Sequence, residues 1–170
     1  MKRLLLLRHA KSSWDDPDLD DHDRPLAKRG RRASKTIAEH LSQESVTADL
    51  VLCSSAQRAR ETLERIAPAL GDGVDVQVEP ELYGASEDRL LERLRAVAED
   101  VESVLLVGHN PGLEQLALEL PGSGDELESL RRKYPTAALA TLEFDGPWRA
   151  LEPGRASLTG FIKPKQLAKR

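Results

Sequence analysis

Short apolar runs alternate along the chain with segments in which apolar residues recur every three or four positions. Residues 3–7, 50–53 and 104–107 are largely apolar runs, which are typical of strands buried on both faces of a parallel sheet. Residues 74–78 alternate between apolar and polar and predict a fourth strand. Strands that alternate with helices predict a three-layer α/β/α fold with a mostly parallel central sheet.

The helical spacing of apolar residues recurs in four segments. It predicts helices over residues 59–70, 90–98 and 113–120, and a weaker helix over residues 31–41. Gly30 would open the weaker helix, and Ser86 is the expected N-cap of the helix that follows it. These helices account for the layers on the two faces of the predicted sheet.

The pattern changes after residue 124. Residues 137–144 and 148–151 flank Asp145-Gly146-Pro147, and this arrangement predicts a hairpin or an edge pair of strands. No shift in composition and no linker divides the chain. We therefore expect residues 1–170 to form a single domain with one core.

Composition narrows the function classes. The 25 Lys and Arg against 29 Asp and Glu give a net charge of −4, which argues against a nucleic-acid-binding protein. Cys53 is the one cysteine, so an intramolecular disulfide is excluded and a reducing compartment is favoured. The N-terminal apolar run is shorter than the roughly 7 to 15 residues of a signal peptide. We expect a cytoplasmic protein with neither a membrane nor a nucleic acid as partner.

Basic and imidazole side chains follow three of the predicted strands. Arg8 and His9 follow the first strand, Arg58 comes shortly after the second, and His109 follows the third. Each alone has an ordinary structural explanation, but the carboxyl ends of parallel strands meet at one edge of a sheet. We therefore expect the four side chains to converge, with the two imidazoles within about 10 Å of each other.

Two guanidinium groups and two imidazoles form a site suited to a phosphoryl dianion that needs no metal or other cofactor. His9 would attack phosphorus as a neutral imidazole, while Arg8, Arg58 and His109 would stabilise the transferring oxygens. Glu81 follows the predicted fourth strand and is the best candidate for a general acid. A phosphatase with a phosphohistidine intermediate is the predicted enzyme.

Several segments resemble, in the same order, those of the histidine phosphatase superfamily, which has the phosphoglycerate-mutase-like fold. The similar segments are Leu-Leu-Leu-Arg8-His9-Ala10-Lys11-Ser12, Asp23-Arg24-Pro25-Leu26 with Gly30, Leu52-Cys53-Ser54-Ser55 with Arg58 and Glu61-Thr62, Glu81-Leu82-Tyr83, and Val107-Gly108-His109-Asn110-Pro111. The chain is most similar to the small SixA-type phosphohistidine phosphatases. It departs from the family at Ala10, where a glycine is usual, and it lacks room for the capping insertions of the mutases.

The resemblance implies that His9 is the phosphorylated nucleophile and that Arg8, Arg58 and His109 form its phosphate pocket. It also suggests that Arg24 approaches the phosphate. The substrate that it favours is a phosphohistidine-bearing protein, and the alternative is a small phosphomonoester such as a sugar phosphate or a nucleotide. Lys11 is a further candidate for binding the rest of the substrate, as are Trp14 and the loop 15–23. The oligomeric state stays open.

A cysteine phosphatase is the sharpest alternative enzyme because Cys53 also follows a strand. That chemistry requires a cysteine and an arginine separated by five residues, whereas Arg58 comes after four and Arg60 after six. Cys53 is therefore expected to be a small buried residue. The variant Cys53→Ser should keep almost full turnover.

Two readings from other classes remain. The acidic loop begins like a calcium-binding loop at Asp16, Asp18 and Asp20, but Asp21 stands where glycine is needed and Ala27 where glutamate is needed. A solvated acidic loop beside the pocket is the favoured interpretation. A non-catalytic module that binds a phosphorylated ligand is the other alternative, and turnover that disappears in His9→Ala would exclude it.

Overall fold

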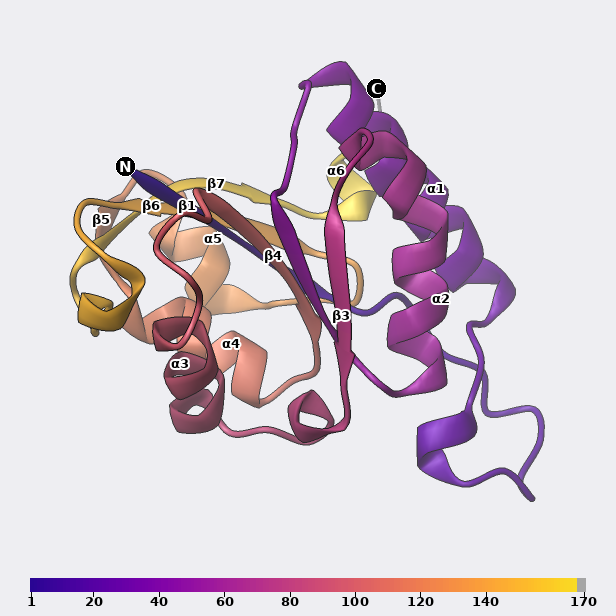
Figure 1. Ribbon diagram of the computed structural model, residues 1–170. Coiled ribbons are helices and arrows are strands. Elements are labelled where there is room, and N and C mark those ends of the chain that lie inside the picture. Colours follow the sequence, from indigo (N-terminus) through magenta and orange to yellow (C-terminus); the bar gives the residue numbers. More distant parts are fainter. Residues whose placement is uncertain (168–170) are drawn as a thin grey trace.

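The computed structural model describes residues 1–167 of the chain, and its centre is one seven-stranded sheet (Figure 1). The strands are β1 (Lys2–Arg8), β2 (Leu50–Ser54), β3 (Asp75–Glu79), β4 (Ser103–Gly108), β5 (Pro121–Gly124), β6 (Leu139–Phe144) and β7 (Ala156–Ile162). Their order is β3-β2-β4-β1-β6-β7-β5. Strand β6 runs antiparallel to β1 and β7, and the other neighbours are parallel.

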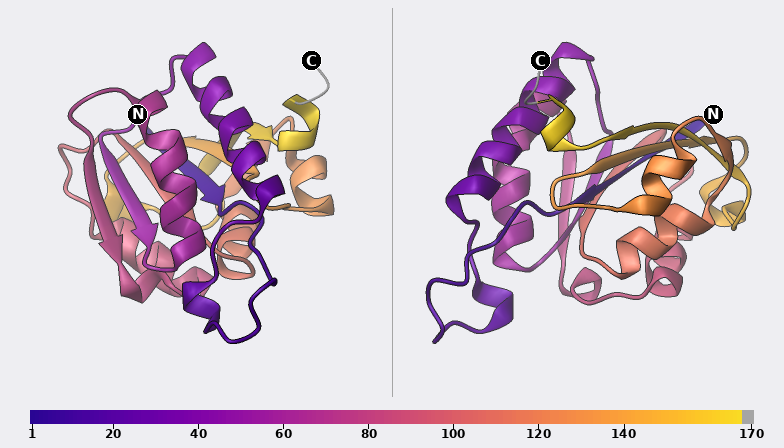
Figure 2. Two further views of the ribbon diagram at one scale, coloured as in Figure 1. Left: turned by 90° about the vertical axis from the view of Figure 1, so that its right-hand side faces the viewer. Right: turned by 180° about the vertical axis from the view of Figure 1, so that it is seen from behind.

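Helices cover both faces of the sheet, which completes the predicted α/β/α layering (Figure 2). The helices are α1 (Lys28–Gln43), α2 (Gln57–Ile66), α3 (Glu87–Arg95), α4 (Gly112–Glu119), α5 (Leu127–Arg132) and α6 (Pro164–Leu167). Short 3-10 segments are η1 (Asp21–Asp23), η2 (Ala67–Leu70), η3 (Pro80–Leu82) and η4 (Trp148–Ala150). Side chains of α1 and α2 pack on one face, and those of α3, α4 and α5 pack on the other.

The strands at the centre of the sheet contribute side chains to both hydrophobic clusters. Leu4 and Leu6 of β1 lie in the cluster beneath α3 and α4, whereas Leu5 and Leu7 lie in the cluster beneath α1 and α2. All four leucines are at most 1% exposed. This double-sided burial explains why the run is continuously apolar rather than alternating.

The predicted strands 3–7, 50–53, 74–78 and 104–107 are confirmed as β1, β2, β3 and β4, and Ser86 is confirmed as the N-cap of α3, since its hydroxyl accepts from the Arg89 amide at 3.3 Å. The first helix is longer than predicted. It begins at Lys28, so Gly30 lies inside α1 rather than before it. A Cβ at residue 30 would lie 2.1 Å from the carbonyl oxygen of Lys11, and glycine is therefore present because helix and loop touch there.

The predicted hairpin of residues 137–144 and 148–151 is wrong in its second half. Strand β6 pairs instead with β7, and Trp148 lies in a 3-10 turn. Burial of the indole explains the difference. Its ring packs on Phe144 with 5.1 Å between ring centroids, and its Nε1 donates to the carbonyl of Val101 at 2.7 Å.

No helix within residues 1–167 combines the length and the apolar character that crossing a membrane requires.

Candidate active site

Four predicted site residues meet at one edge of the sheet, where β1, β2 and β4 end. Arg8 is the last residue of β1 and His9 follows it, while His109 follows the last residue of β4. Arg58 lies in the first turn of α2, which the end of β2 leads into. The backbone joins these ends directly, since the His9 amide donates to the Gly108 carbonyl at 3.1 Å.

The His9 ring is held in one orientation by the backbone. Its Nδ1 lies 2.7 Å from the carbonyl oxygen of Ala10, and because a carbonyl can only accept, Nδ1 carries the hydrogen. The Nε2 lone pair is therefore free. Burial, together with the nearby cations Arg58 and Arg8, lowers the pKa of His9 to about 4, so that the imidazole is neutral at pH 7.

His109 lies beside His9, with 5.0 Å between the ring centroids, well within the expected separation. Its Nε2 is 2.7 Å from the hydroxyl of Ser54, the last residue of β2, while its Nδ1 is buried without a partner among the described residues. Burial and the proximity of His9 lower the pKa of His109 to about 3. Both imidazoles are thus neutral in the free protein.

Each of the two arginines has a terminal nitrogen that is hydrogen-bonded to the backbone and an Nε that is not. A terminal nitrogen of Arg8 donates to the Tyr134 carbonyl at 3.0 Å, and a terminal nitrogen of Arg58 donates to the backbone oxygen of Asp21 at 2.7 Å. The Nε atoms of Arg8 and Arg58 are buried and have no partner within residues 1–167. Buried donors without acceptors are rare in folded proteins and mark a place that an anion can fill.

Asp21 was not singled out from the sequence, yet it lies at the centre of the hydrogen bonds of the site. Its carboxylate accepts from Arg58 at 3.0 Å, from Nε of Arg24 at 3.1 Å and from the hydroxyl of Tyr83 at 2.5 Å. The Tyr83 hydrogen bond and the Arg58 contact hold the pKa of Asp21 well below its usual range. No pattern in the sequence distinguishes Asp21 from the neighbouring acidic residues of the loop 15–23.

Arg24 is buried at the border of the site. Besides Asp21, its guanidinium donates to the Ser12 hydroxyl at 2.7 Å and lies over the Trp14 ring at 3.5 Å from the centroid. The backbone carbonyl of Lys11 accepts from the Ala27 amide at 2.9 Å, but the Lys11 side chain is exposed. Of these two predicted binding residues, Arg24 alone hydrogen-bonds to a side chain of the site.

The segment that follows β3 reaches the site through Tyr83 rather than Glu81. The Tyr83 ring packs edge-on to His109 with 5.5 Å between centroids and lies 5.9 Å from the Arg58 guanidinium. Glu81 is exposed, and within the described chain its carboxylate makes no hydrogen bond or ion pair. The role of Glu81 as an acid stays a prediction.

The alternatives of cysteine and metal chemistry can be compared with the structure. Cys53 is fully buried in the cluster beneath α1 and α2, and burial raises the pKa of its thiol to about 12, which disfavours the thiolate that a nucleophile requires. In residues 1–167, no three His, Cys, Asp or Glu side chains converge in the way that metal ligands do.

The family model described as "Histidine phosphatase superfamily (branch 1)" matches residues 4–85. The phosphohistidine phosphatase SixA of Escherichia coli is 30% identical over 146 residues, which cover 84% of this chain and 86% of that protein. The chain belongs to the histidine phosphatase superfamily. This histidine phosphatase is also 38% identical over 163 residues to an uncharacterized protein of Mycobacterium tuberculosis, covering 94% of this chain and all of the relative.

Solved structures agree with this membership. The protein histidine phosphatase SixA complexed with tungstate superposes on this histidine phosphatase with a TM-score of 0.79 at 27% identity, covering 97% of this chain and 99% of that one. A mycobacterial glucosyl-3-phosphoglycerate phosphatase reaches a TM-score of 0.63 at 18% identity, covering 93% and 97% of the two chains, and shares the fold. The protein is therefore a phosphatase that acts on a phosphorylated substrate, with the phosphoglycerate-mutase-like fold.

Proposed function

We propose that this histidine phosphatase, as a single domain of residues 1–170, hydrolyses phosphohistidine on a protein substrate through a phosphohistidine intermediate on His9. Three of these residues, 168–170, lie outside the described part. The observation that carries the proposal is the hydrogen bond from His9 Nδ1 to Ala10, which leaves Nε2 unprotonated beside His109. A neutral imidazole with a fixed lone pair is a nucleophile at pH 7.

The reaction then has two displacements at phosphorus. The Nε2 lone pair of His9 forms the new N–P bond while the P–N bond to the substrate imidazole breaks, and the departing nitrogen takes up a proton from water. Water next attacks the phosphorus of phospho-His9, gives up a proton, and releases inorganic phosphate with neutral His9. Neither displacement requires an oxidant, a reductant or a group beyond substrate and water.

The unpartnered nitrogen atoms support the role of a phosphate pocket. Among residues 1–167, the buried Nε atoms of Arg8 and Arg58 have no acceptor and can each donate to a ligand. The Nδ1 of His109 can donate as well when the Ser54 hydroxyl donates to its Nε2. If these three donors face a phosphoryl group on His9, they would stabilise the charge of the transferring oxygens. The tungstate in the similar SixA structure is a tetrahedral oxyanion, as phosphate is.

The state of the carboxyl groups favours a phosphohistidine over an ester. Asp21 hydrogen-bonds to Tyr83, Arg58 and Arg24, and these contacts lower its pKa, so it is a poor proton donor. Glu81 is exposed. An alcohol leaving group needs a strong proton donor. The P–N bond of phosphohistidine is labile, so an imidazole departs with less protonation. The runner-up, a small phosphomonoester, requires Glu81 to move toward the substrate and act as that donor.

A substrate panel tests the choice between them. We expect kcat/KM for a phosphohistidine peptide to exceed that for sugar phosphates and nucleotides by about 100-fold or more. Glu81→Gln should leave phosphohistidine turnover unchanged. Higher kcat/KM for an ester, together with its loss in Glu81→Gln, would establish the runner-up instead.

The intermediate is tested separately. His9→Ala should lower kcat by about 1,000-fold or more and abolish acid-labile labelling of the enzyme by radioactive substrate. His40→Ala is a matched control, because His40 also has a buried Nδ1 without a partner but lies in the second half of α1. Phosphate binding without turnover by the native protein on every substrate would point to the binding module.

A further inference from the structure

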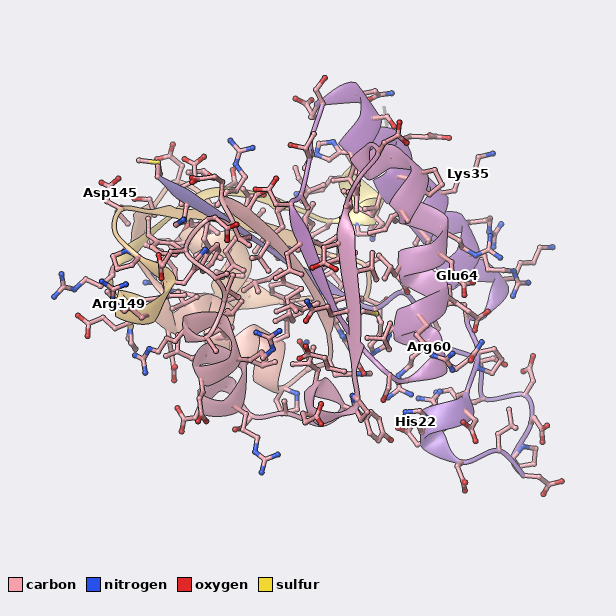
Figure 3. The ribbon with its side chains drawn as sticks, viewed as in Figure 1. His22, Lys35, Arg60, Glu64, Asp145 and Arg149 are labelled. Atoms are coloured by element: carbon pink, nitrogen blue, oxygen red, sulfur yellow. The ribbon has the colours of Figure 1, made fainter. Side chains whose placement is uncertain are left out.

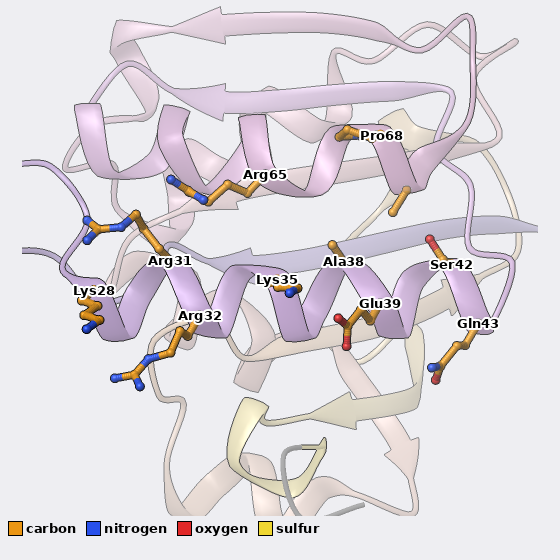
Figure 4. Close-up of a pocket in the computed structure, with 11 residues that line it drawn as sticks. Lys28, Arg31, Arg32, Lys35, Ala38, Glu39, Ser42, Gln43, Arg65 and Pro68 are labelled. Atoms are coloured by element: carbon orange, nitrogen blue, oxygen red, sulfur yellow. The ribbon is translucent and has the colours of Figure 1, made fainter.

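The first half of α1 carries a run of cations that the catalytic site does not use. Lys28, Arg31, Arg32 and Lys35 lie at helical spacing along a groove of about 900 Å³ between α1 and the segment α2–η2, and Arg65 lies on the opposite wall. In Figure 4, Arg31 and Arg65 lie between the two helices, whereas Lys28 and Arg32 extend from the outer side of α1. Glu39 is the one carboxylate among the groove residues. This set of five cations is called the basic groove below.

Folding explains one of these charges, since Arg31 donates to the Leu26 carbonyl, but not the other four. The helix dipole places positive potential at the beginning of a helix, so cations in that position oppose it, and the first turn of α1 has no acidic residue to offset them. None of the five cations forms an ion pair with a carboxylate within residues 1–167. In a protein of net charge −4, such a cluster is available to an external partner.

The basic groove has an apolar floor as well as a charged rim. Ala38 of α1 faces Pro68 and Ala69 of η2 across the groove. Nucleic acids are bound through phosphates and through stacking on aromatic rings, but no aromatic side chain lines the groove. A small apolar floor bordered by cations fits an amphipathic helix whose polar face is acidic.

The basic groove begins next to the catalytic edge of the sheet. Helix α2 brings Arg58 in its first turn, and α1 begins four residues after Arg24. A backbone segment joins the two regions, since Leu26 donates its amide to Glu61 at 3.1 Å and accepts from Arg31 at 3.0 Å. A partner seated in the groove therefore lies beside the phosphate pocket.

We propose that the basic groove binds an acidic amphipathic helix of the phosphohistidine-bearing protein and thereby selects the substrate. The inference rests on the proposed function for the identity of the partner. Electrostatic attraction at this rim would act mainly on substrate capture, so it should change KM and leave kcat unchanged.

Two synthetic peptides and two variants test the proposal. Both peptides carry the same phosphohistidine segment, joined to a helix with leucines on one face and either glutamates or glutamines on the other. The groove variant is Lys28→Gln, Arg32→Gln and Lys35→Gln. The matched control is Arg3→Gln, Arg149→Gln and Arg155→Gln, which removes the same charge elsewhere; Figure 3 shows Arg149 on the opposite side of the molecule from Lys35.

We expect the groove variant to raise KM for the acidic peptide about tenfold, with kcat unchanged and with no effect on the glutamine peptide. The control variant should behave as the native protein does, and added salt should erase the preference for the acidic peptide. Equal KM values for the acidic peptide in the native protein and the groove variant would overturn the proposal.

A binding measurement separates this inference from the proposed function. Fluorescence anisotropy with the same peptides lacking the phosphoryl group requires no turnover. If neither phosphorylated peptide is hydrolysed but a phosphomonoester is, the proposed function is wrong, while anisotropy still decides whether the groove prefers the acidic helix. Tighter binding of single-stranded RNA or of phosphatidylserine vesicles, lost in the groove variant, would overturn the choice of a protein partner.

Discussion

The two ends of the central strands carry buried polar groups of very different kinds. At the amino end, the buried Lys2 ammonium donates to the carbonyls of Glu99 and Val101, at 2.5 and 2.9 Å. At the carboxyl end, the Nε atoms of Arg8 and Arg58 have no acceptor in the part of the chain that the structure describes. Charge that is satisfied internally holds a fold together, whereas charge left over is available to a ligand.

The comparison predicts that the same kind of substitution has opposite consequences at the two ends. Removal of a residue that holds an unpaired donor should impair the reaction more than stability, and removal of a fully paired residue should do the reverse.

After His9→Ala, Arg58→Ala should give the largest effect at the carboxyl end. Because Arg58 is expected to donate to the transferring oxygens, kcat/KM should fall by about 100- to 1,000-fold. The measurement is steady-state turnover of a phosphohistidine peptide, with thermal unfolding as the companion. An unchanged kcat/KM would remove Arg58 from the phosphate pocket.

Acidification should weaken the carboxyl end selectively. In the unfolded chain a histidine takes up a proton near pH 6.5, whereas His9 and His109 in the folded protein have pKa values of about 4 and about 3. Their contribution to the free energy of unfolding is therefore complete above pH 7 and is lost as the pH falls below 6.5, by at most about 1.4 kcal/mol per pH unit for each ring.

Chemical denaturation of the native protein and of His9→Gln between pH 7 and 5 measures this contribution. The variant should lose less stability on acidification, and NMR titration of the native protein should show a neutral His9 at pH 5.5. A His9 resonance that titrates near pH 6.5 would contradict the neutral, buried nucleophile.

Lys2→Met should reverse the pattern seen for Arg58. Loss of the ammonium leaves two carbonyls without their donor, so the free energy of unfolding should fall by about 1 to 3 kcal/mol. Turnover at 25 °C should remain that of the native protein. A loss of kcat without a loss of stability would break the distinction between the two ends.

Cys53→Ser should give the smallest effect of the series when stability and turnover are taken together. It places a hydroxyl among apolar side chains and should lower the free energy of unfolding by about 1 to 2 kcal/mol, with kcat almost unchanged. Abolished turnover in a folded Cys53→Ser protein would revive cysteine chemistry, and alkylation of the native thiol would then be the next measurement.

The sequence predicted the parts of the fold that depend on continuous burial. The runs that form β1, β2 and β4 are apolar because both faces are covered, and their ends placed His9 and His109 correctly at one edge. Strand β5, Pro121–Gly124, has no apolar pattern at all, since it lies at the sheet edge and is mostly exposed. This strand forms because it pairs with β7, and no local sequence pattern predicts it.

The site was predictable where a residue type is uncommon and follows a strand, and it was hidden where neither condition holds. His9 and His109 meet both conditions, whereas Arg8 is a common residue type that ends the first strand. Asp21 is one of several acids in its loop, and only the fold shows that it is the one that contacts Arg58. Tyr83 was overlooked in favour of Glu81 because a phenol gave no catalytic reason to choose it.

Gly30 connects the surface proposed to select the substrate with the loop that leads away from His9. With a carbonyl of that loop only 2.1 Å from where a Cβ would be, any other residue would wedge the first helix outward. The proposed partner surface and the loop after His9 thus depend on the same close contact between α1 and Lys11. A change of substrate specificity through α1 would have to alter the exposed side chains of α1 and keep glycine at position 30.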